Sequence, residues 1–215
     1  MAFFPVFVEW EGIPCMIAGG GPVALHKAEL LCSLGADVTV VAPIICPELQ
    51  ALPIRIYLRK VSKEDVSGQC LVVDATGDAE TTLLLQKACR EQHIPFNSAS
   101  RAEGGTAVFP AVYREGRTML AVSSLGASPA ASALLRDLLA EHIPTCMDVI
   151  METMAELRMQ SREAFNTQPM RSQFLHSCLN EMMRRQRALH PEEVLQIQHS
   201  IEENSFGDDS IEKKP

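Results

Sequence analysis

Aromatic residues and positive charge are both scarce in this chain of 215 residues. Phe, Trp and Tyr make up 5% of the sequence, and the formal net charge is −8 at pH 7. Polyanions repel such a chain, so neither a nucleic acid nor an anionic membrane is expected as its main partner. No apolar run reaches the roughly 18–20 residues that span a bilayer. No basic segment precedes the first apolar stretch, as it would in a signal peptide. These absences favour a cytoplasmic protein.

Paired cysteine motifs are also missing. The seven cysteines are widely spaced and odd in number, and none forms a Cys-x-x-Cys pair. No cluster of His, Cys or carboxylate residues has the spacing of a metal site. We therefore expect reduced thiols in an apolar core, with neither a disulfide framework nor a bound metal.

The sequence does contain an apolar segment that runs into three glycines and then into a helical stretch. Gly19, Gly21 and Ala24 occupy the three small-residue positions of a dinucleotide fingerprint. Gly19 would allow the tight turn, Gly21 the approach of a pyrophosphate, and Ala24 close packing of the helix on the strand. Pro22 fits the first helical turn, and the helix N-terminus favours phosphate charge. The pattern predicts a nucleotide site, although a tight turn that binds nothing would have the same residues.

Short apolar segments alternate with helical segments through the first half of the chain. Strands are expected at 14–18, 38–42, 54–58, 70–75 and 95–99. Helical segments are expected at 23–34, 62–66 and 78–92, the last with Ala79, Leu83, Leu84 and Ala88 facing inward. This alternation is typical of parallel βαβ units with right-handed crossovers. We expect an α/β fold with a Rossmann-like parallel sheet, in the order 3-2-1-4-5, within a domain at 1–112.

The pattern changes after this domain. Strand-like runs at 106–114 and 118–124 flank Glu115-Gly116-Arg117 and indicate a hairpin. Ser128 and Pro129 then cap and begin a helix that extends to about Glu141, which completes a second region at 113–144. The segment 145–203 is helical throughout, and 204–215 is polar enough for a disordered tail. Seven of the ten methionines lie at 147–183; they could form a flexible core or dimer face, or a surface for a large flat ligand.

Six segments together resemble the precorrin-2 dehydrogenase family over about residues 3–145. They are Phe4-Pro5-Val6-Phe7, 17–24 followed by Lys27, 35–43, 73–78, Phe109-Pro110-Ala111 and 122–129. The last two are more specific than the glycine turn. This family, which includes the siroheme synthase N-terminal module, oxidises precorrin-2 to sirohydrochlorin with NAD, and some members also insert iron. The resemblance implies NAD as cofactor, a tetrapyrrole substrate, and a homodimer with 113–144 as the dimerisation region.

The family's nucleotide contacts can be carried over to individual positions. They map onto Gly19, Gly21, Pro22, Val23, Pro43, Ile44 and Thr76. An ordinary Rossmann domain has an acidic residue about 20 positions on that binds the ribose. Here Val41-Ala42-Pro43 offers no carboxylate and no adjacent arginine. Charge therefore does not decide between NAD and NADP, and NAD is favoured by the resemblance alone.

The chain departs from the family at the proposed proton acceptor. In the family an Asp follows an Asn by three residues; here Asn97 is present but Ser100 stands at the Asp position, followed by Arg101. A serine hydroxyl is not a base near neutral pH, and an arginine opposes nearby positive charge. Glu103 is close enough in sequence to be a substitute base. The four candidate catalytic residues are thus Asn97, Ser100, Glu103 and Ser124.

Ser124 aligns with a pocket serine that is phosphorylated in some family members, although a serine at a strand end could equally complete a turn. The acid groups of a tetrapyrrole would need cationic partners. Candidates are Arg101, Arg114, Arg117 and Arg136. Any iron would be substrate and not a resident metal.

Three functions remain open on the sequence. The first is an NAD-dependent precorrin-2 dehydrogenase, with or without a different base. The second is a weakly active or inactive homologue that binds a tetrapyrrole or NAD and partners another enzyme of haem or sirohaem synthesis. The third is an unrelated small Rossmann reductase or nucleotide sensor.

Overall fold

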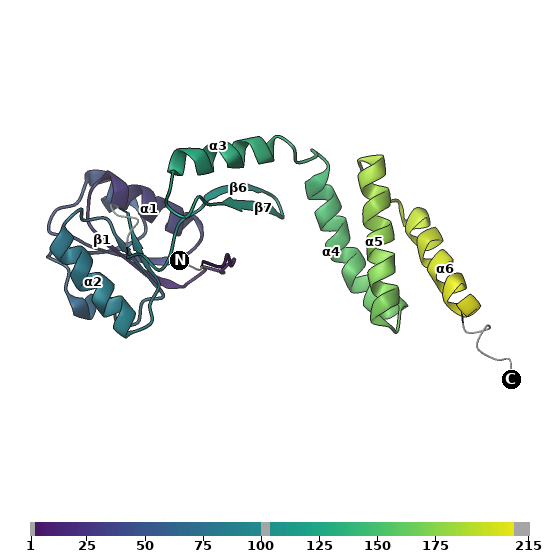
Figure 1. Cartoon of the computed structure of the whole chain (residues 1–215), viewed down its shortest axis with the longest axis horizontal. Coiled ribbons are helices and arrows are strands. Elements are labelled where there is room, and N and C mark those ends of the chain that lie inside the picture. The colour runs from purple at the N-terminus through teal and green to yellow at the C-terminus, as the bar shows by residue number, and fades with distance from the viewer. Residues whose placement is uncertain (1–2, 100–103, 209–215) are drawn as a thin grey trace. The chain divides into compact units, whose positions relative to one another are not determined.

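The chain folds into two compact units, each with a core of its own. The computed structural model describes residues 3–99 and 104–208. The first unit comprises the residues up to Pro110 together with Ser123–Pro129, and the second comprises Ala111–Val122 and the chain from Ala130 onward. Figure 1 shows the sheet of the first unit and the helices of the second.

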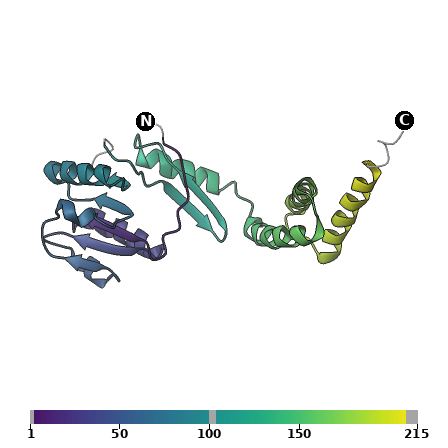
Figure 2. The same cartoon turned by 90° about the horizontal axis from the view of Figure 1, so that it is seen from below.

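The first unit contains the parallel sheet that the sequence predicts. Its five strands are β1 (Pro14–Ala18), β2 (Asp37–Val41), β3 (Arg55–Tyr57), β4 (Leu71–Asp74) and β5 (Phe96–Ser98). They lie side by side in the order β3-β2-β1-β4-β5, and every pair is parallel (Figure 2). The expected fold class and strand order are therefore confirmed.

Helices cover both faces of this sheet, because successive residues of each buried strand point to opposite sides. Cys15 and Ile17 of β1 pack with α1 (Pro22–Ser33), whereas Met16 and Ala18 pack with α2 (Ala79–Glu91). The 3-10 helices η1 (Pro47–Ala51) and η2 (Lys63–Val66) contribute one buried residue each to these two cores. The carboxyl ends of β1, β2 and β4 are thereby fixed at one edge of the sheet.

The buried face of α2 differs from the expected one. Leu83 and Leu84 are 65% and 40% exposed, and the inward positions belong to Thr82, Leu85, Ala88 and Cys89. The difference has a specific cause, since the hydroxyl of Thr82 donates a hydrogen bond to the buried carboxylate of Asp74. Of the four residues expected on the inward face, only Ala88 is buried, and Ala79 is exposed like the two leucines.

The second unit begins with an antiparallel hairpin of β6 (Ala111–Glu115) and β7 (Thr118–Val122). The first strand starts later than the expected 106, because the backbone N–H groups of Thr106 and Ala107 donate to Phe96 on β5 instead. The helices that follow are α3 (Pro129–Ala140), α4 (Met147–Ala164), α5 (Gln168–Arg185) and α6 (Pro191–Asp208). Helix α6 therefore extends into the segment 204–215 that composition assigns to a tail, and 209–215 lie outside the described residues.

Helices α4, α5 and α6 form a bundle in which α5 contacts both neighbours. Phe165 and Phe174 pack at a ring separation of 5.3 Å, together with Leu157, Cys178 and Met182. The methionine-rich segment thus supplies part of a real core, although Met159 remains 62% exposed.

All seven cysteines are free thiols; Cys15, Cys89 and Cys178 are buried, whereas Cys70 is exposed and so lies outside the expected apolar core. Burial raises the pKa of Cys15 to about 12 and that of Cys178 to about 11, so both stay protonated near neutral pH. No helix in the described part of the chain is long and apolar enough to span a membrane. Within residues 3–99 and 104–208, no group of three or more His, Cys, Asp or Glu side chains could hold a metal ion.

Candidate nucleotide-binding site

The turn after β1 presses against the loop that follows β4. Gly19 has φ +118°, a backbone conformation that side chains disfavour, and a Cβ added there would lie 2.5 Å from the Ala75 carbonyl oxygen and 3.1 Å from the Thr76 nitrogen. Glycine is therefore required at this position for both conformation and space. The contact brings two predicted site residues, Gly19 and Thr76, to the same edge of the sheet.

Gly20, to which the sequence analysis gave no role, holds the turn against the loop after β2. A Cβ at Gly20 would overlap the Ile44 carbonyl oxygen and lie 2.8 Å from the Ile45 Cα. The Gly20 carbonyl also accepts a hydrogen bond of 2.7 Å from the Cys46 N–H. The dinucleotide fingerprint requires glycine at positions 19 and 21 but not at 20. The extra glycine was the sequence signal for this role.

Gly21 faces open space. It is the N-cap of α1 with φ −93°, no side-chain cap satisfies the helix end, and a Cβ added there would meet no atom within 4 Å. The first turn of α1 holds no acidic residue, and its ladder begins with the Leu25 N–H donating to the Gly21 carbonyl. Backbone N–H groups and the positive end of the helix dipole thus point to a place where an anion can approach closely. The site fits a dinucleotide pyrophosphate.

The remaining predicted nucleotide contacts lie around this turn. Pro22 and Val23 begin α1, with Val23 51% exposed, and Pro43 and Ile44 follow β2, with Ile44 81% exposed. Exposed apolar surface next to a helix N-terminus suits the adenine ring of a nucleotide whose phosphates sit at the turn. The structure thus brings all seven predicted nucleotide contacts to the carboxyl edge of the sheet, around β1, β2 and β4.

A buried carboxylate, which the sequence analysis missed, fixes the loop after β4. Asp74 is fully buried, and its Oδ1 accepts hydrogen bonds from the Thr76 backbone N–H at 3.0 Å and from the Thr76 hydroxyl at 2.6 Å. Its Oδ2 accepts from the Thr82 hydroxyl at 2.5 Å. Because these bonds satisfy the carboxylate inside the protein, they hold Thr76 in one orientation at the edge of the site. A lone Asp at the end of an apolar strand was the only sequence signal.

One arginine near the β3 end of this edge is already paired. Arg59, two residues after β3, forms hydrogen bonds of 2.6 and 2.7 Å to both oxygens of Asp65 and lies over the Tyr57 ring. The Arg59 guanidinium holds the pKa of Asp65 below its usual range. A paired arginine offers little to a ribose 2′-phosphate.

The candidate catalytic residues are placed only in part. Ser100 and Glu103 lie outside the described residues, as does Arg101. Asn97 is 9% exposed on β5, and its Nδ2 donates 2.9 Å to the Ala107 carbonyl. Asn97 thus anchors the chain that returns past β5, which is a structural task.

Ser124 forms a local turn. Its Oγ accepts from the Ser128 N–H at 2.9 Å and donates to the Ser128 carbonyl at 3.0 Å. The neighbouring Leu125 adopts φ +54°, and its N–H donates to the Ser123 hydroxyl. These bonds fit the turn-forming alternative for Ser124.

Comparison with known proteins identifies relatives of this chain. Residues 6–111 match a family model described as "Putative NAD(P)-binding". The siroheme synthase of Thioalkalivibrio sulfidiphilus is 37% identical over 148 residues, which are 67% of this chain and 30% of that protein. The siroheme synthase of Nitrosomonas eutropha is 33% identical over 184 residues, which are 83% of this chain and 39% of that protein. The chain therefore spans about a third of the length of these curated relatives.

A solved structure extends the likeness in fold to both units. SirC, a precorrin-2 dehydrogenase, matches with a TM-score of 0.69 and 24% sequence identity, covering 94% of this chain and all of that one. The match includes the parallel sheet, the hairpin and the helical segment. The family model supports a nicotinamide dinucleotide, NAD or NADP, as the cofactor. The chain is thus related in sequence to siroheme synthases over about a third of their length, and its fold is that of SirC.

Proposed function

We propose that the protein is an NAD-dependent dehydrogenase that oxidises precorrin-2 to sirohydrochlorin. The observation that carries this proposal is the open backbone at Gly21, at the N-terminus of α1, in a chain related in sequence to siroheme synthases. NAD, a tetrapyrrole, a homodimer and a cytoplasmic location belong to the same proposal.

The chain's own residues would divide the binding of the nucleotide. The N–H groups of the first turn of α1 would bind the pyrophosphate, Pro43 and Ile44 would contact the adenosine, and Thr76 would orient the nicotinamide half. Thr76 can hold one orientation because Asp74 accepts both its N–H and its hydroxyl. When bound, NAD+ supplies the acceptor for a hydride from the macrocycle.

The oxidation also releases one proton, and the chain must place an acceptor for it. Ser100 stands where the family has an Asp, and a serine hydroxyl is too weak a base to accept a proton near neutral pH. Glu103, three residues further, would take the proton in its place, or the proton would pass to water at a lower rate. In the family the same Asp assists iron insertion, so the loss of a base would weaken both activities together.

The competing function is a homologue with little or no oxidation activity that binds a tetrapyrrole or NAD and partners another enzyme of sirohaem synthesis. The observation that favours it is Ser100-Arg101 in place of an acid. Both functions predict binding of the nucleotide, the macrocycle or both, and turnover is what separates them.

Turnover is tested by mixing the protein with precorrin-2 and NAD and following the absorbance of sirohydrochlorin and NADH. We expect slow turnover in the wild type and a gain of about 10²–10⁴-fold in Ser100→Asp, the range that a positioned base contributes. Loss of activity in Glu103→Ala would identify Glu103 as the substitute base. No turnover in either the wild type or Ser100→Asp, with nucleotide binding intact, would overturn the dehydrogenase and leave the binding protein.

A further inference from the structure

The helical unit contains a groove outside the nucleotide site, between α4 and α5. Its volume is about 950 Å³, which is at the upper end of the roughly 300–1,000 Å³ of small-molecule sites. Both helices contribute residues at helical spacing, from Met151 to Arg162 on α4 and from Gln168 to Leu179 on α5. At 1.5 Å per residue, each stretch of lining runs for about 16 Å. The groove is therefore long enough for an extended ligand.

The charge of the lining is entirely positive. Four arginines line it and no Asp or Glu does, although the whole chain has a net charge of −8; the four are Arg117, Arg158, Arg162 and Arg171. In the described part of the chain, none of the four forms an ion pair. At the other end of α5, by contrast, Arg184 and Arg185 are both paired with Glu181. Four uncompensated guanidinium groups around one groove attract a ligand with several anionic groups.

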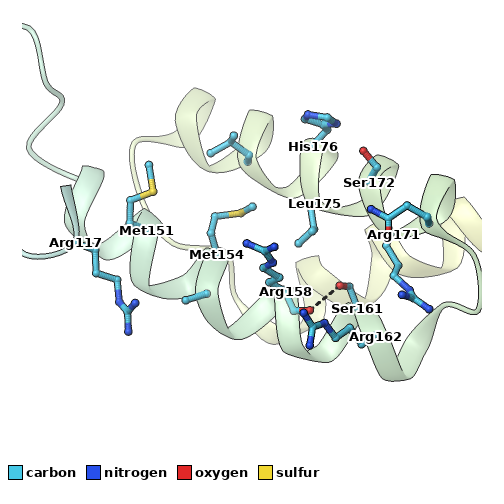
Figure 3. A pocket seen from close by; sticks show the side chains of 13 residues that line it. Arg117, Met151, Met154, Arg158, Ser161, Arg162, Arg171, Ser172, Leu175 and His176 are labelled. Carbon is cyan, nitrogen blue, oxygen red and sulfur yellow. Dashed lines mark hydrogen bonds between the residues drawn. The ribbon is translucent and has the colours of Figure 1, made fainter. Parts of the chain in front are cut away.

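Two of the arginines are held in place at opposite ends of the groove. The backbone N–H of Arg117 donates 3.0 Å to the Asp148 carboxylate in the first turn of α4, which ties the hairpin tip to the helix. Arg171 is half-buried, and its guanidinium donates to the carbonyls of Phe165 and Asn166, neutral partners that leave its charge uncompensated. Figure 3 shows Arg117 and Arg171 at the two ends, with Arg158 and Arg162 between them.

The part of the lining between the charges is apolar. Met154, Leu175 and Leu179 are half-buried, and Met151 is 38% exposed. Thioether and leucine side chains adapt to the face of a broad apolar body. A small inorganic anion would use only the arginines and would leave this surface uncovered. The lining therefore selects a molecule with a wide apolar body and several acid groups at its rim.

We propose that this arginine groove binds a tetrapyrrole polycarboxylate, with its acid side chains on the arginines and its macrocycle against Met154 and Leu175. The lining of the groove by itself points to an amphipathic molecule with several acid groups. That this molecule is a tetrapyrrole rests on the proposed function. The second unit thus has a ligand-binding role of its own.

The probe is uroporphyrin, a fluorescent tetrapyrrole with eight carboxylates that the dehydrogenase reaction does not consume. Its affinity for the full chain is measured by fluorescence titration for wild type and for Arg158→Gln/Arg162→Gln. We expect the double variant to bind at least tenfold more weakly and Arg158→Lys/Arg162→Lys to recover most of the loss. Lys87→Gln/Arg90→Gln removes the same charge from exposed positions of α2 and should change the affinity less than twofold. Mesoporphyrin, with two carboxylates, should bind more weakly than uroporphyrin.

Equal uroporphyrin affinity in wild type and Arg158→Gln/Arg162→Gln would overturn the groove, as would equal losses in both double glutamine variants. Precorrin-2 oxidation, assayed in parallel, separates this outcome from the failure of the proposed function. If precorrin-2 is oxidised and Arg158→Gln/Arg162→Gln binds uroporphyrin as the wild type does, the dehydrogenase proposal stands and the groove proposal is refuted. If uroporphyrin binding depends on the arginines but neither the wild type nor Ser100→Asp oxidises precorrin-2, the groove proposal is supported and the dehydrogenase proposal is refuted. Circular dichroism and NAD affinity report whether each variant is folded.

Discussion

Gly20 and Gly21 are neighbours in one turn, yet a methyl group should have opposite effects at the two positions. At Gly20 it would overlap the backbone carbonyl of Ile44, which cannot swing aside as a side chain can. Gly20→Ala should therefore lower the free energy of unfolding by about 1–3 kcal/mol. At Gly21 it would meet no protein atom and φ is −93°, so Gly21→Ala should keep the stability of the wild type. It should instead weaken NAD binding by about tenfold, or roughly 1.4 kcal/mol.

Urea unfolding and calorimetric titration with NAD, performed on both variants, test this pair, and each variant is the control for the other. Wild-type NAD affinity in Gly21→Ala would mean that the pyrophosphate does not approach this residue. Wild-type stability in Gly20→Ala would mean that the loop after β2 can shift to make room.

The glycine turn could be predicted from the sequence because its requirements are local. The spacing of small residues between a strand and a helix is visible without knowledge of the rest of the fold. The role of Asp74 could not be predicted in this way, since its partner Thr82 comes from a helix whose rotation about its axis is set by packing. Ser100 remains a prediction from sequence alone.

Among the elements, the junction of α5 and α6 depends on one carboxylate. Glu193 accepts hydrogen bonds from the Arg187 guanidinium at 2.9 and 3.0 Å and from the backbone N–H of His190 at 2.7 Å, and it is paired with Arg185. These groups lower the pKa of Glu193 from an ordinary 4.5 to about 2. A carboxyl group with a lowered pKa in the folded state stabilises that state above its unfolded pKa. The stabilisation is lost as the pH falls from about 4.5 to about 2.

We therefore expect the helical circular dichroism of the protein to decrease over this acidic range at low salt. In Glu193→Gln part of the decrease should be absent, because that variant lacks the pairing already at neutral pH. Added salt should reduce the difference, since the ion pairs are partly open to solvent and salt screens them. Glu192→Gln removes a neighbouring carboxylate that forms no ion pair within the described part of the chain, and its acid profile should match that of the wild type. Identical acid profiles for Glu193→Gln and the wild type would show that the junction does not depend on this pairing.

The existence of the helices and strands was easier to predict than their faces and ends. Alternating apolar and helical stretches placed all five strands of the sheet within a residue or two, because buried parallel strands are continuous apolar runs. The inward face of α2 was wrong at Leu83 and Leu84, because the helix turns Thr82 toward Asp74 and buries Leu85 and Cys89 instead. The start of β6 was wrong because Thr106 and Ala107 bind β5.

For the molecule as a whole, the order of the strands followed from the sequence and the arginine groove did not. Right-handed crossovers leave few ways to arrange five parallel strands, so a correct list of elements nearly determines the sheet. The groove joins two helices and a hairpin tip that are distant in sequence. Its arginines are separated by ordinary helical spacing that is equally typical of a solvated face.

The last prediction concerns assembly. Helix α3 exposes four leucines on adjoining turns, and Leu134, Leu135, Leu138 and Leu139 are 60%, 50%, 46% and 50% exposed. Full burial of a leucine contributes roughly 1.5–3 kcal/mol, so an isolated chain forgoes much apolar burial along this helix. A second copy of the chain would cover it, as the proposed homodimer requires. Sedimentation velocity should then show a dimer for the wild type and a monomer for Leu134→Glu/Leu138→Glu.

The matched control is Leu83→Glu, which adds a charge at a leucine of α2 that is 65% exposed and should leave the dimer unchanged. A wild type that sediments as a monomer at micromolar concentrations would refute the homodimer. A dimer that survives both α3 substitutions would place the interface elsewhere. The groove arginines lie on α4, α5 and the hairpin and not on α3. The α3 variant therefore also tests whether ligand binding in the groove depends on dimerisation. A folded monomer that keeps uroporphyrin affinity would mean that one chain supplies the complete groove, whereas a loss of affinity on dissociation would assign part of it to the partner.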